Sequence, residues 1–378
     1  MIYLDNAATT KPVKDISRLY ADYSESGWFN PSALYSPALS VEKEMESSRS
    51  VIKSVINAPD MIFTSCGTES ANTVIFNGWR RKGKEKFHFI TSSYEHPCVY
   101  EAFRHLEELG HDVTYVVPGK KGYIDEEDLV KEIRPDTALV AIMHVNNETG
   151  AINDITSLSR AVKKANPDTL FFSDGVQGFL HVPFDMKNSM VDYYSASAHK
   201  IHGLKGTGAL FFRHDSPLRE YIYGGGQERN LRSGTENTFG IFVFRKAVSD
   251  HLSRNEEISR HLSELKEKCV SSLMKIKGAY LISPERSSDH IINIAFEGVR
   301  GEVLLHLLEQ NSIYISTGSA CSSKKRTYRI HDSVGVPHNI SECVIRISFS
   351  DENTLDEIDE LCKVTELAVE RFSRYSRR

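Results

Sequence analysis

The sequence predicts an α/β fold, with a large domain built on a mainly parallel sheet flanked by helices and a smaller α+β domain at the C-terminal end. Between residues 61 and 213, short apolar stretches alternate with amphipathic helical segments. This alternation is typical of parallel strands whose connecting helices cover both faces of a sheet. A different order of helices and strands follows further along the chain. We therefore expect a large domain over 15–255 and a small domain formed by 1–14 and 256–378.

The large domain begins with a predicted helix and continues with strands and helices in turn. Residues 36–57 place apolar side chains on one helical face, and this segment ends near Pro59. Amphipathic runs lie between several of the later strands, with apolar residues such as Val99, Phe103 and Leu106 at helical spacing. The strand candidates are MIFTS, FHFITSS, DVTYVV, ALVAIMHV, TLFFSDG, VDYYSAS and GALFFR.

The small domain is predicted to alternate helices with strands. Residues 318–340, rich in Ser, Gly and Lys, are interpreted as a long loop, and a loop of this length in a compact domain is usually functional or disordered. The other elements are a helix with Ile258, Leu262, Leu265, Cys269 and Leu273 on its apolar face, the strand HIINIAF, the helix GEVLLHLLEQ, the strand VIRISFS and a last helix from Leu355.

The composition is that of an ordinary soluble protein. The formal net charge of -5 offers no overall attraction to nucleic acid or to an anionic membrane. The N-terminus lacks a basic-then-apolar signal pattern, and no run of about 18 apolar residues occurs. Six cysteines without a CxxC pair favour neither a disulfide framework nor a zinc site. We expect a cytoplasmic protein that binds no metal, no membrane and no nucleic acid directly.

Two lysines in the stretch SASAHKIHGLKGTG compete for a chemical role. A Walker phosphate loop needs a lysine directly before Ser or Thr, whereas Lys205 is followed by Gly206, so the spacing excludes that motif. Lys200 lies just after a predicted strand and could form a Schiff base with an aldehyde cofactor or a carbonyl substrate. Alternatively, Lys200 is a solvated surface charge. The residues at the ends of the other predicted strands distinguish these two interpretations.

Polar clusters follow five of the predicted strands, where the carboxyl edge of the sheet should lie. CGTES starts a helix and suits a phosphate, although Thr68 could serve only as a helix cap. His96 alone could be structural, and Asn147 alone could be a turn residue. Asp174 at a buried strand end needs a cationic partner. Together with Lys200, these clusters at one edge favour a shared site.

The clusters fit pyridoxal 5'-phosphate as a cofactor. Lys200 would bind its aldehyde, Asp174 would hold the pyridine nitrogen protonated, and the helix start with its hydroxyl groups would hold the phosphate. His96 would lie on the ring face and exchange protons. Lys200, once displaced by substrate, would become the base at Cα.

A series of motifs runs through nearly the whole chain. They are YLDNAATT (3–10), NPSALYS, TSCGTESAN, SSYEHPCV, MHVNNETG, SDGVQ, SAHKIHG, GGGQERNLRSGTEN, STGSACSS and VIRISFS. Together they are highly specific, and they resemble a cysteine desulfurase of the class V aminotransferase family, of the type that serves iron-sulfur cluster assembly. The resemblance implies the type I pyridoxal-phosphate fold.

The resemblance also implies a role for each site residue. Lys200 would be the Schiff-base lysine, His96 would stack on the ring, and Asp174 and Gln177 would hold its nitrogen and its phenolic oxygen. Thr235 would reach the phosphate from a partner subunit, which implies a homodimer. The remaining phosphate ligands would be Gly67, Thr68, Ser197 and His199, the substrate carboxylate would meet Asn147 and Arg346, and Cys321 would take the sulfur.

Some positions depart from the pattern of relatives. Tyr35 stands where relatives often have His. Gly175 stands where relatives often have Ala, which removes a methyl group expected to pack near the cofactor ring. The stretch KKRTYRIHDSVGVP after Cys321 is unusually basic, and this bears on the sulfur acceptor more than on the chemistry.

The favoured reaction converts L-cysteine to L-alanine and leaves a persulfide on Cys321. Small neighbours would let that segment carry sulfur outward, and Lys324, Lys325 and Arg326 could favour the thiolate. A buried, unreactive thiol is the alternative for Cys321. The acceptor of the sulfur would be an iron-sulfur scaffold or a thiolation protein. An ordinary aminotransferase would instead need a 2-oxo acid and no thiol, and a binding module without activity would lack some of these groups.

Overall fold

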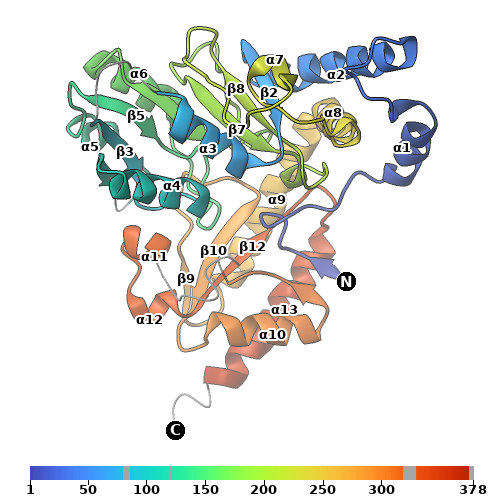
Figure 1. Cartoon of the computed structure of the whole chain (residues 1–378). Coiled ribbons are helices and arrows are strands. Elements are labelled where there is room, and N and C mark those ends of the chain that lie inside the picture. The colour runs from blue at the N-terminus through green and yellow to red at the C-terminus, as the bar shows by residue number, and fades with distance from the viewer. Residues whose placement is uncertain (80–85, 120, 318–328, 374–378) are drawn as a thin grey trace.

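The computed structural model describes residues 1–79, 86–119, 121–317 and 329–373. Its main feature is a seven-stranded sheet in the order β2-β8-β7-β6-β5-β3-β4, which lies across the upper part of the molecule in Figure 1. The strands are β2 (Asp60–Thr64), β3 (His88–Ser92), β4 (Asp112–Val116), β5 (Thr137–Ala141), β6 (Leu170–Asp174), β7 (Tyr193–Ser197) and β8 (Gly208–Phe212).

The sheet is mainly parallel, as the alternation of strands and helices predicts. β3 pairs in parallel with β4 and β5, and β5, β6 and β7 continue the parallel order. β8 runs antiparallel to both of its neighbours, β7 and β2. The parallel strands therefore end at one edge of the sheet, where their polar clusters come together.

Helices cover both faces of this sheet, because neighbouring residues of each strand point to opposite sides. Leu139 packs in the core with α3 (Gly67–Asn77) and α4 (Pro97–Glu108), whereas Val140 packs in the core with α2 (Ser36–Ser54), α6 (Ile155–Ala165) and α8 (Thr238–Ser253). Burial on both faces explains why the strands read as continuous apolar runs. The remaining helical elements beside the sheet are α1 (Ile16–Asp22), the π-helical turn Tyr23–Gly27, α5 (Glu126–Val130) and α7 (Gln227–Asn230).

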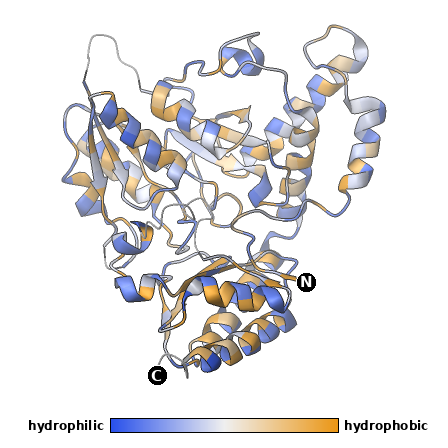
Figure 2. Ribbon diagram, turned by 60° about the horizontal axis from the view of Figure 1, so that its bottom comes forward, coloured by the Kyte–Doolittle hydropathy of each residue, from blue (hydrophilic) through white to orange (hydrophobic). Residues whose placement is uncertain are grey.

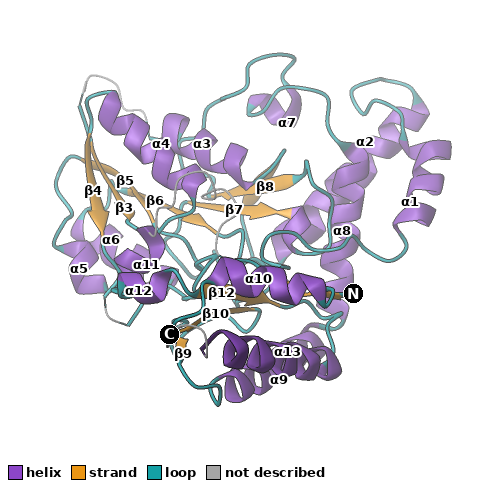
Figure 3. Cartoon of the chain, turned by 90° about the horizontal axis from the view of Figure 1, so that it is seen from below, coloured by secondary structure: helices purple, strands orange, loops and turns teal. Residues whose placement is uncertain are grey.

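The C-terminal part of the chain forms a separate antiparallel sheet in the order β12-β10-β9. Its strands are largely hydrophobic (Figure 2), and the predicted apolar face of α9 is buried, which confirms that pattern. α9 and α13 lie side by side below this sheet (Figure 3). The elements are α9 (Asn255–Leu273), β9 (Ala279–Leu281), β10 (Ile291–Phe296), α10 (Gly301–Gln310), β12 (Val344–Ser348) and α13 (Leu355–Ser373).

The N-terminus adds a strand to this region, since β1 (Ile2–Tyr3) pairs in parallel with β11 (Ile313–Tyr314). Leu4 packs in the same apolar core as α9 and β10. The domain boundaries drawn from the sequence stay a prediction.

The long loop predicted over 318–340 needs a correction in its described part. From residue 329 on, the chain forms the short helices α11 (Arg329–Ser333) and α12 (His338–Ser341). Ile330 and Ile340 are buried, so apolar anchors hold these turns against the protein. The two helices were not predicted, because only a few apolar residues, among them Ile330 and Ile340, occur within a largely polar stretch.

Within the described part of the chain, none of the helices combines the length with the apolar composition that crossing a bilayer requires.

Candidate active site

A cavity of about 270 Å³ opens at the carboxyl ends of the strands of the large sheet. The N-terminal segment and β12 close it from the side of the small sheet. This position matches the rule that parallel sheets carry their sites at the carboxyl ends of the strands. The lining residues are Ala7, Ala8, Cys66, Gly67, Thr68, His96, Cys98, Met143, Val145, Asn147, Asp174, Val176, Gln177, Ser197, His199, Lys200 and Arg346.

All the site residues predicted from the sequence line this cavity, except two. Thr235 lines a separate cavity of about 90 Å³ together with Ser65 and Arg232. Cys321 lies outside the described residues. The fold therefore gathers residues from six separate segments, while the role of each residue stays a prediction.

One end of the cavity combines a helix N-terminus with a buried hydroxyl, a combination that suits an anion. The backbone of Cys66 is extended, and α3 begins at Gly67, so the first N–H groups of the helix have no partner within the helix. A Cβ atom at Gly67 would lie 2.5 Å from the Val176 side chain, which explains the glycine at this close approach. The hydroxyl of Ser197 is buried and has no hydrogen-bond partner among the described residues.

His199 lies at the same end of the cavity, directly before Lys200. Its Nδ1 lies 3.2 Å from the hydroxyl of Thr9. Burial and the neighbouring positive charges of Lys200 and Lys205 lower the pKa of His199 to about 4. His199 is therefore a neutral hydrogen-bonding group at neutral pH.

Lys200 ends the short 3-10 turn Ala198–Lys200 that follows β7. Its Nζ donates to the carbonyl oxygens of Ala7 at 2.6 Å and Ala8 at 2.8 Å. Lys200 thus crosses the cavity to the N-terminal segment. Lys205 follows on the exposed turn and does not line the cavity.

Asp174 is the last residue of β6 and is 5% exposed. One of its carboxylate oxygens accepts hydrogen bonds from the backbone N–H of Val176 at 3.0 Å and from the Ser195 hydroxyl at 3.1 Å. These bonds fix the carboxylate with its other oxygen directed toward Cys98, 3.9 Å away. A protonated ring nitrogen is a suitable partner for this buried carboxylate.

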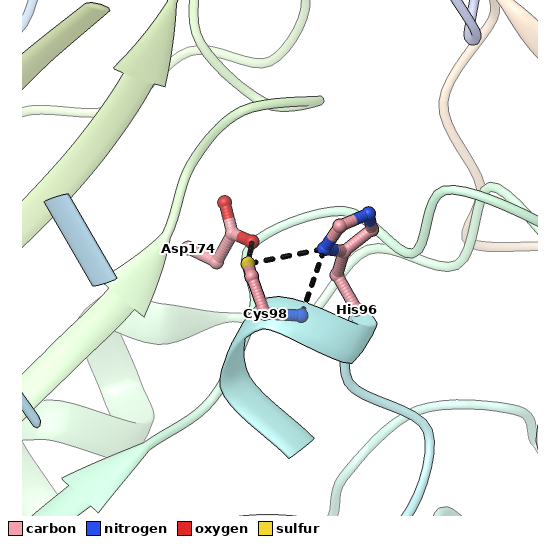
Figure 4. A group of neighbouring side chains, drawn as sticks. All are labelled: His96, Cys98 and Asp174. Carbon is pink, nitrogen blue, oxygen red and sulfur yellow. Dashed lines mark hydrogen bonds between the residues drawn. The ribbon is translucent and has the colours of Figure 1, made fainter. Parts of the chain in front are cut away.

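His96 caps the N-terminus of α4, next to Pro97 at the first helical position. The backbone N–H of Cys98 donates to His96 Nδ1 at 3.2 Å, and the Cys98 thiol lies 3.0 Å from the same nitrogen (Figure 4). Because a backbone N–H can only donate, Nδ1 accepts and the proton of the neutral ring sits on Nε2. Burial, together with the positive charge of Lys200, lowers the pKa of His96.

His96, Cys98 and Asp174 also form a group whose ligand atoms all lie within 4.8 Å of one another, close enough to hold a metal ion. Burial raises the pKa of the Cys98 thiol well above its usual range, and the charge of Asp174 adds to this effect. A soft metal ion requires the thiolate. The environment therefore favours a protonated thiol beside the carboxylate, and the expectation of no metal stays a prediction.

Arg346 comes from β12, on the far side of the cavity, and is 3% exposed. Its Nη2 donates to Asp5 Oδ1 at 2.7 Å and its Nη1 donates to the backbone oxygen of Asn147 at 2.8 Å. Nε of Arg346 and Oδ1 of Asn147 are buried and have no partner among the described residues. Such groups are expected to bind a polar ligand, because unpaired buried polar atoms destabilise a fold.

The structure corrects the interpretation of Gly175. A Cβ atom at this position would lie 1.9 Å from the ring of Tyr194, and Gly175 does not line the cavity. The missing methyl group therefore makes room for Tyr194, a buried tyrosine of β7.

Three features of the site were not predicted from the sequence. The carbonyl oxygens of Ala7 and Ala8 were hidden, because a backbone group leaves no chemical signature in a sequence. Cys66 and Cys98 were hidden because nothing in the sequence distinguishes these cysteines from structural ones. Both cysteines lie close in sequence to predicted site residues, Gly67 and His96, and this proximity could have indicated that they line the cavity.

Comparisons with known proteins agree on one family. The model of the family "Aminotransferase class-V" matches residues 2–361. The chain is 38% identical to a "NifS/IcsS protein homolog" of Lactobacillus delbrueckii subsp. bulgaricus, over 99% of this chain and 98% of that protein. It is 35% identical to a "Cysteine desulfurase IscS" of Methanosarcina thermophila, over 99% of this chain and 93% of that protein. A solved "NIFS-LIKE PROTEIN" superposes with a TM-score of 0.92 at 35% identity, covering 98% of this chain and 99% of that one.

Proposed function

The chain belongs to the aminotransferase class-V family, and from this membership and the make-up of its cavity we propose that it is a cysteine desulfurase that uses pyridoxal 5'-phosphate. The observation that carries the proposal is the meeting of Lys200, Asp174 and Arg346 in one cavity with the N-terminus of α3. The similarity to a protein named cysteine desulfurase over nearly the full length of both chains supports cysteine as the substrate.

The cavity residues fit the cofactor. Thr68, Ser197 and His199, with the first amides of α3 from Gly67, would hold its phosphate, and the unpartnered Ser197 hydroxyl supports this assignment. Asp174 and Gln177 would hold the ring nitrogen and the phenolic oxygen, His96 would lie on the ring face, and Lys200 would bind the aldehyde. When bound, the cofactor supplies an electron sink next to Cα of the amino acid.

The other groups of the cavity orient the substrate and move its protons. Arg346 and Asn147 bind the carboxylate of cysteine, which the free Nε of Arg346 supports. Lys200 Nζ takes the proton from Cα. His96 is neutral and carries its proton on Nε2, so it acts as a donor in its resting form.

The sulfur goes to Cys321. The Cys321 thiolate attacks the sulfur of the substrate, so that an S–S bond forms while the C–S bond breaks, and the electron pair of the C–S bond stays with carbon. That carbon, Cβ, gains a proton and Cα regains the one that Lys200 removed, which yields L-alanine, and the enzyme keeps a persulfide on Cys321. An acceptor protein, an iron-sulfur scaffold or a thiolation protein, then removes the sulfur in the cytoplasm.

The active enzyme is a homodimer in this proposal. Thr235 lies apart from the cavity of its own chain and would reach the phosphate of the partner subunit. Tyr223 is 80% exposed, and Trp28, Leu34 and Tyr35 are exposed as well. Apolar side chains exposed in this number support a surface that is covered by a second subunit.

The decisive experiment compares Cys321→Ser with Cys343→Ser, a buried cysteine outside the cavity. Both variants should bind the cofactor and cysteine, since neither step uses the thiol. Cys321→Ser should lose production of alanine and sulfide, whereas Cys343→Ser should retain it. Wild type treated with cysteine alone should gain one sulfur atom on the peptide that contains Cys321, measured by mass spectrometry.

Two outcomes contradict the proposal. Alanine release by Cys321→Ser at the wild-type rate would exclude the persulfide step. A strict requirement of the wild type for a 2-oxo acid would assign it to the ordinary aminotransferases.

A further inference from the structure

The carbonyl oxygen of Ala7 joins two groups of the site. It accepts a hydrogen bond from Lys200 Nζ at 2.6 Å and another from Gln177 Nε2 at 2.8 Å. A carbonyl oxygen can only accept, so the amide of Gln177 must direct its NH2 group toward Ala7. The oxygen of that amide, Oε1, therefore faces the opposite way.

Gln177 Oε1 faces His290, whose Nε2 lies 3.3 Å away. Since Oε1 can only accept, Nε2 of His290 must carry the proton and donate it. Nδ1 of the neutral ring then has a lone pair, and it accepts a hydrogen bond from the Ser288 hydroxyl. One chain of directed bonds thus runs from Ser288 through His290 and Gln177 to Ala7, where Lys200 joins it.

The surroundings of His290 keep its ring neutral and in one place. His290 is 2% exposed and lies directly before β10. The ring of His181 stacks on it, with centroids 3.8 Å apart and planes at 17°. Burial lowers the pKa of both rings, that of His181 to about 3. A neutral ring with Nδ1 occupied by Ser288 has Nε2–H as its one donor.

We propose that His290 is a positioning residue that, together with the Ala7 carbonyl, fixes the orientation of the Gln177 amide. The inference rests on the proposed function, in which Gln177 meets the phenolic oxygen of the cofactor. With its Oε1 held by His290, Gln177 keeps one N–H for Ala7 and has a second N–H for the cavity. Without His290, the amide is held by the Ala7 carbonyl alone, so it is less firmly fixed and more often turns its oxygen toward the cavity, where that oxygen repels a phenolate. His290 thus acts through Gln177 and touches neither substrate nor cofactor, because it does not line the cavity.

The test uses the bound cofactor as its own reporter. A hydrogen-bond donor stabilises the anionic phenolic oxygen, so loss of the donor favours the protonated cofactor up to higher pH. In His290→Phe, the pH midpoint of the visible absorption of the bound cofactor should rise by about half a unit or more. The dissociation constant of pyridoxal 5'-phosphate from the apo-protein should rise about fivefold, as expected for one lost hydrogen bond.

Three further variants separate this role from a merely structural one. His290→Gln keeps an N–H donor where Nε2 lies and should restore most of both values. His88→Phe is the matched control, since His88 is also buried and hydrogen-bonded, to Thr137 and Thr114, but does not line the cavity. It should leave the midpoint unchanged even if it lowers the melting temperature. Ser288→Ala, a milder change, should move the midpoint in the same direction as His290→Phe.

The outcomes that overturn the inference are distinct from those that overturn the proposed function. A wild-type midpoint and affinity in His290→Phe would exclude the positioning role. If His290→Phe does not fold, Ser288→Ala and His290→Gln decide. The positioning role is excluded if the pH midpoint is unchanged in Ser288→Ala but rises by about half a unit or more in His290→Gln. A wild type that binds the cofactor but makes no alanine from cysteine would refute the proposed function alone.

Discussion

The backbone N–H of Cys98 donates to Nδ1 of His96 at 3.2 Å, so the first turn of α4 selects the tautomer of the histidine that faces the cavity. This hydrogen bond uses the main chain of Cys98 and does not require its thiol. The Cys98 thiol, which lies between His96 and Asp174, can therefore be replaced without altering the tautomer of His96.

Cys98→Ala should keep activity within about twofold of wild type, because the amide that orients His96 remains and the thiol is held protonated. Steady-state production of alanine from cysteine measures the effect. His96→Gln, which removes the ring, is the comparison and should lose most of the rate. A loss in Cys98→Ala as large as that in His96→Gln would mean that the thiol takes part in the chemistry.

Lys200 should be the lysine that binds the cofactor covalently, because among the lysines that the structure describes it alone lines the cavity. The purified protein should be yellow, and borohydride reduction followed by peptide mapping should place the cofactor on Lys200. Lys205→Ala should behave like wild type, since Lys205 lies outside the cavity. A label on Lys205, or a covalent adduct in Lys200→Ala, would show the assignment to be wrong.

Arg346→Lys should lower kcat/KM for cysteine by about ten- to hundredfold, mainly through KM, because an ammonium group cannot replace a planar fork. The charge toward Asp5 is retained, so the cofactor spectrum should stay unchanged. Arg254→Lys is a suitable control, since that arginine forms an exposed ion pair with Asp351 outside the cavity. Equal kinetics for Arg346→Lys and wild type would place Arg346 in a structural role only.

Glu95 should make the protein less stable as the pH rises. Burial, with a smaller contribution from the charge of Asp174, raises the pKa of Glu95 from 4.5 to about 8. The folded state therefore binds this proton more tightly than the unfolded state does. The stabilising effect is complete below pH 4.5 and is lost progressively as the pH rises to about 8.

Glu95→Gln should remove this pH dependence, because the amide oxygen can still accept from Ser92 and from the backbone N–H of Met143. Between pH 5 and 8 the stability difference between the variant and wild type should shift toward the variant by up to about 1.4 kcal/mol per pH unit. Urea unfolding at several pH values measures it. Glu101→Gln, at an exposed site, should run parallel to wild type, and a parallel curve for Glu95→Gln would contradict the prediction.

The sequence predicted the fold class and most of the site for one physical reason. Parallel strands bury both faces, which makes them readable as apolar runs, and their carboxyl ends meet at one edge. His96, Asn147, Asp174 and Lys200 each follow such a run, so their meeting in the cavity could be expected without coordinates. The buried face of α9 could likewise be predicted, because its apolar residues recur at helical spacing.

Other features depend on segments that are far apart in the chain, and local patterns say nothing about such contacts. The ring of Tyr194 fills the space above Gly175, and Asp5 binds Arg346 across 341 positions. The short helices after residue 329 depend on a few apolar anchors within a polar stretch.

By itself, then, the sequence determined which side chains stand at the edge of the sheet, because strand periodicity and polar termini are local properties. Only the tertiary structure decided how these side chains are oriented. The tautomer of His96, the acceptors of Lys200 and the link from His290 to Gln177 follow from hydrogen-bond partners that folding brings together. Hydrogen bonds are directional and act over about 3 Å, so their pattern exists only once the distant segments have met.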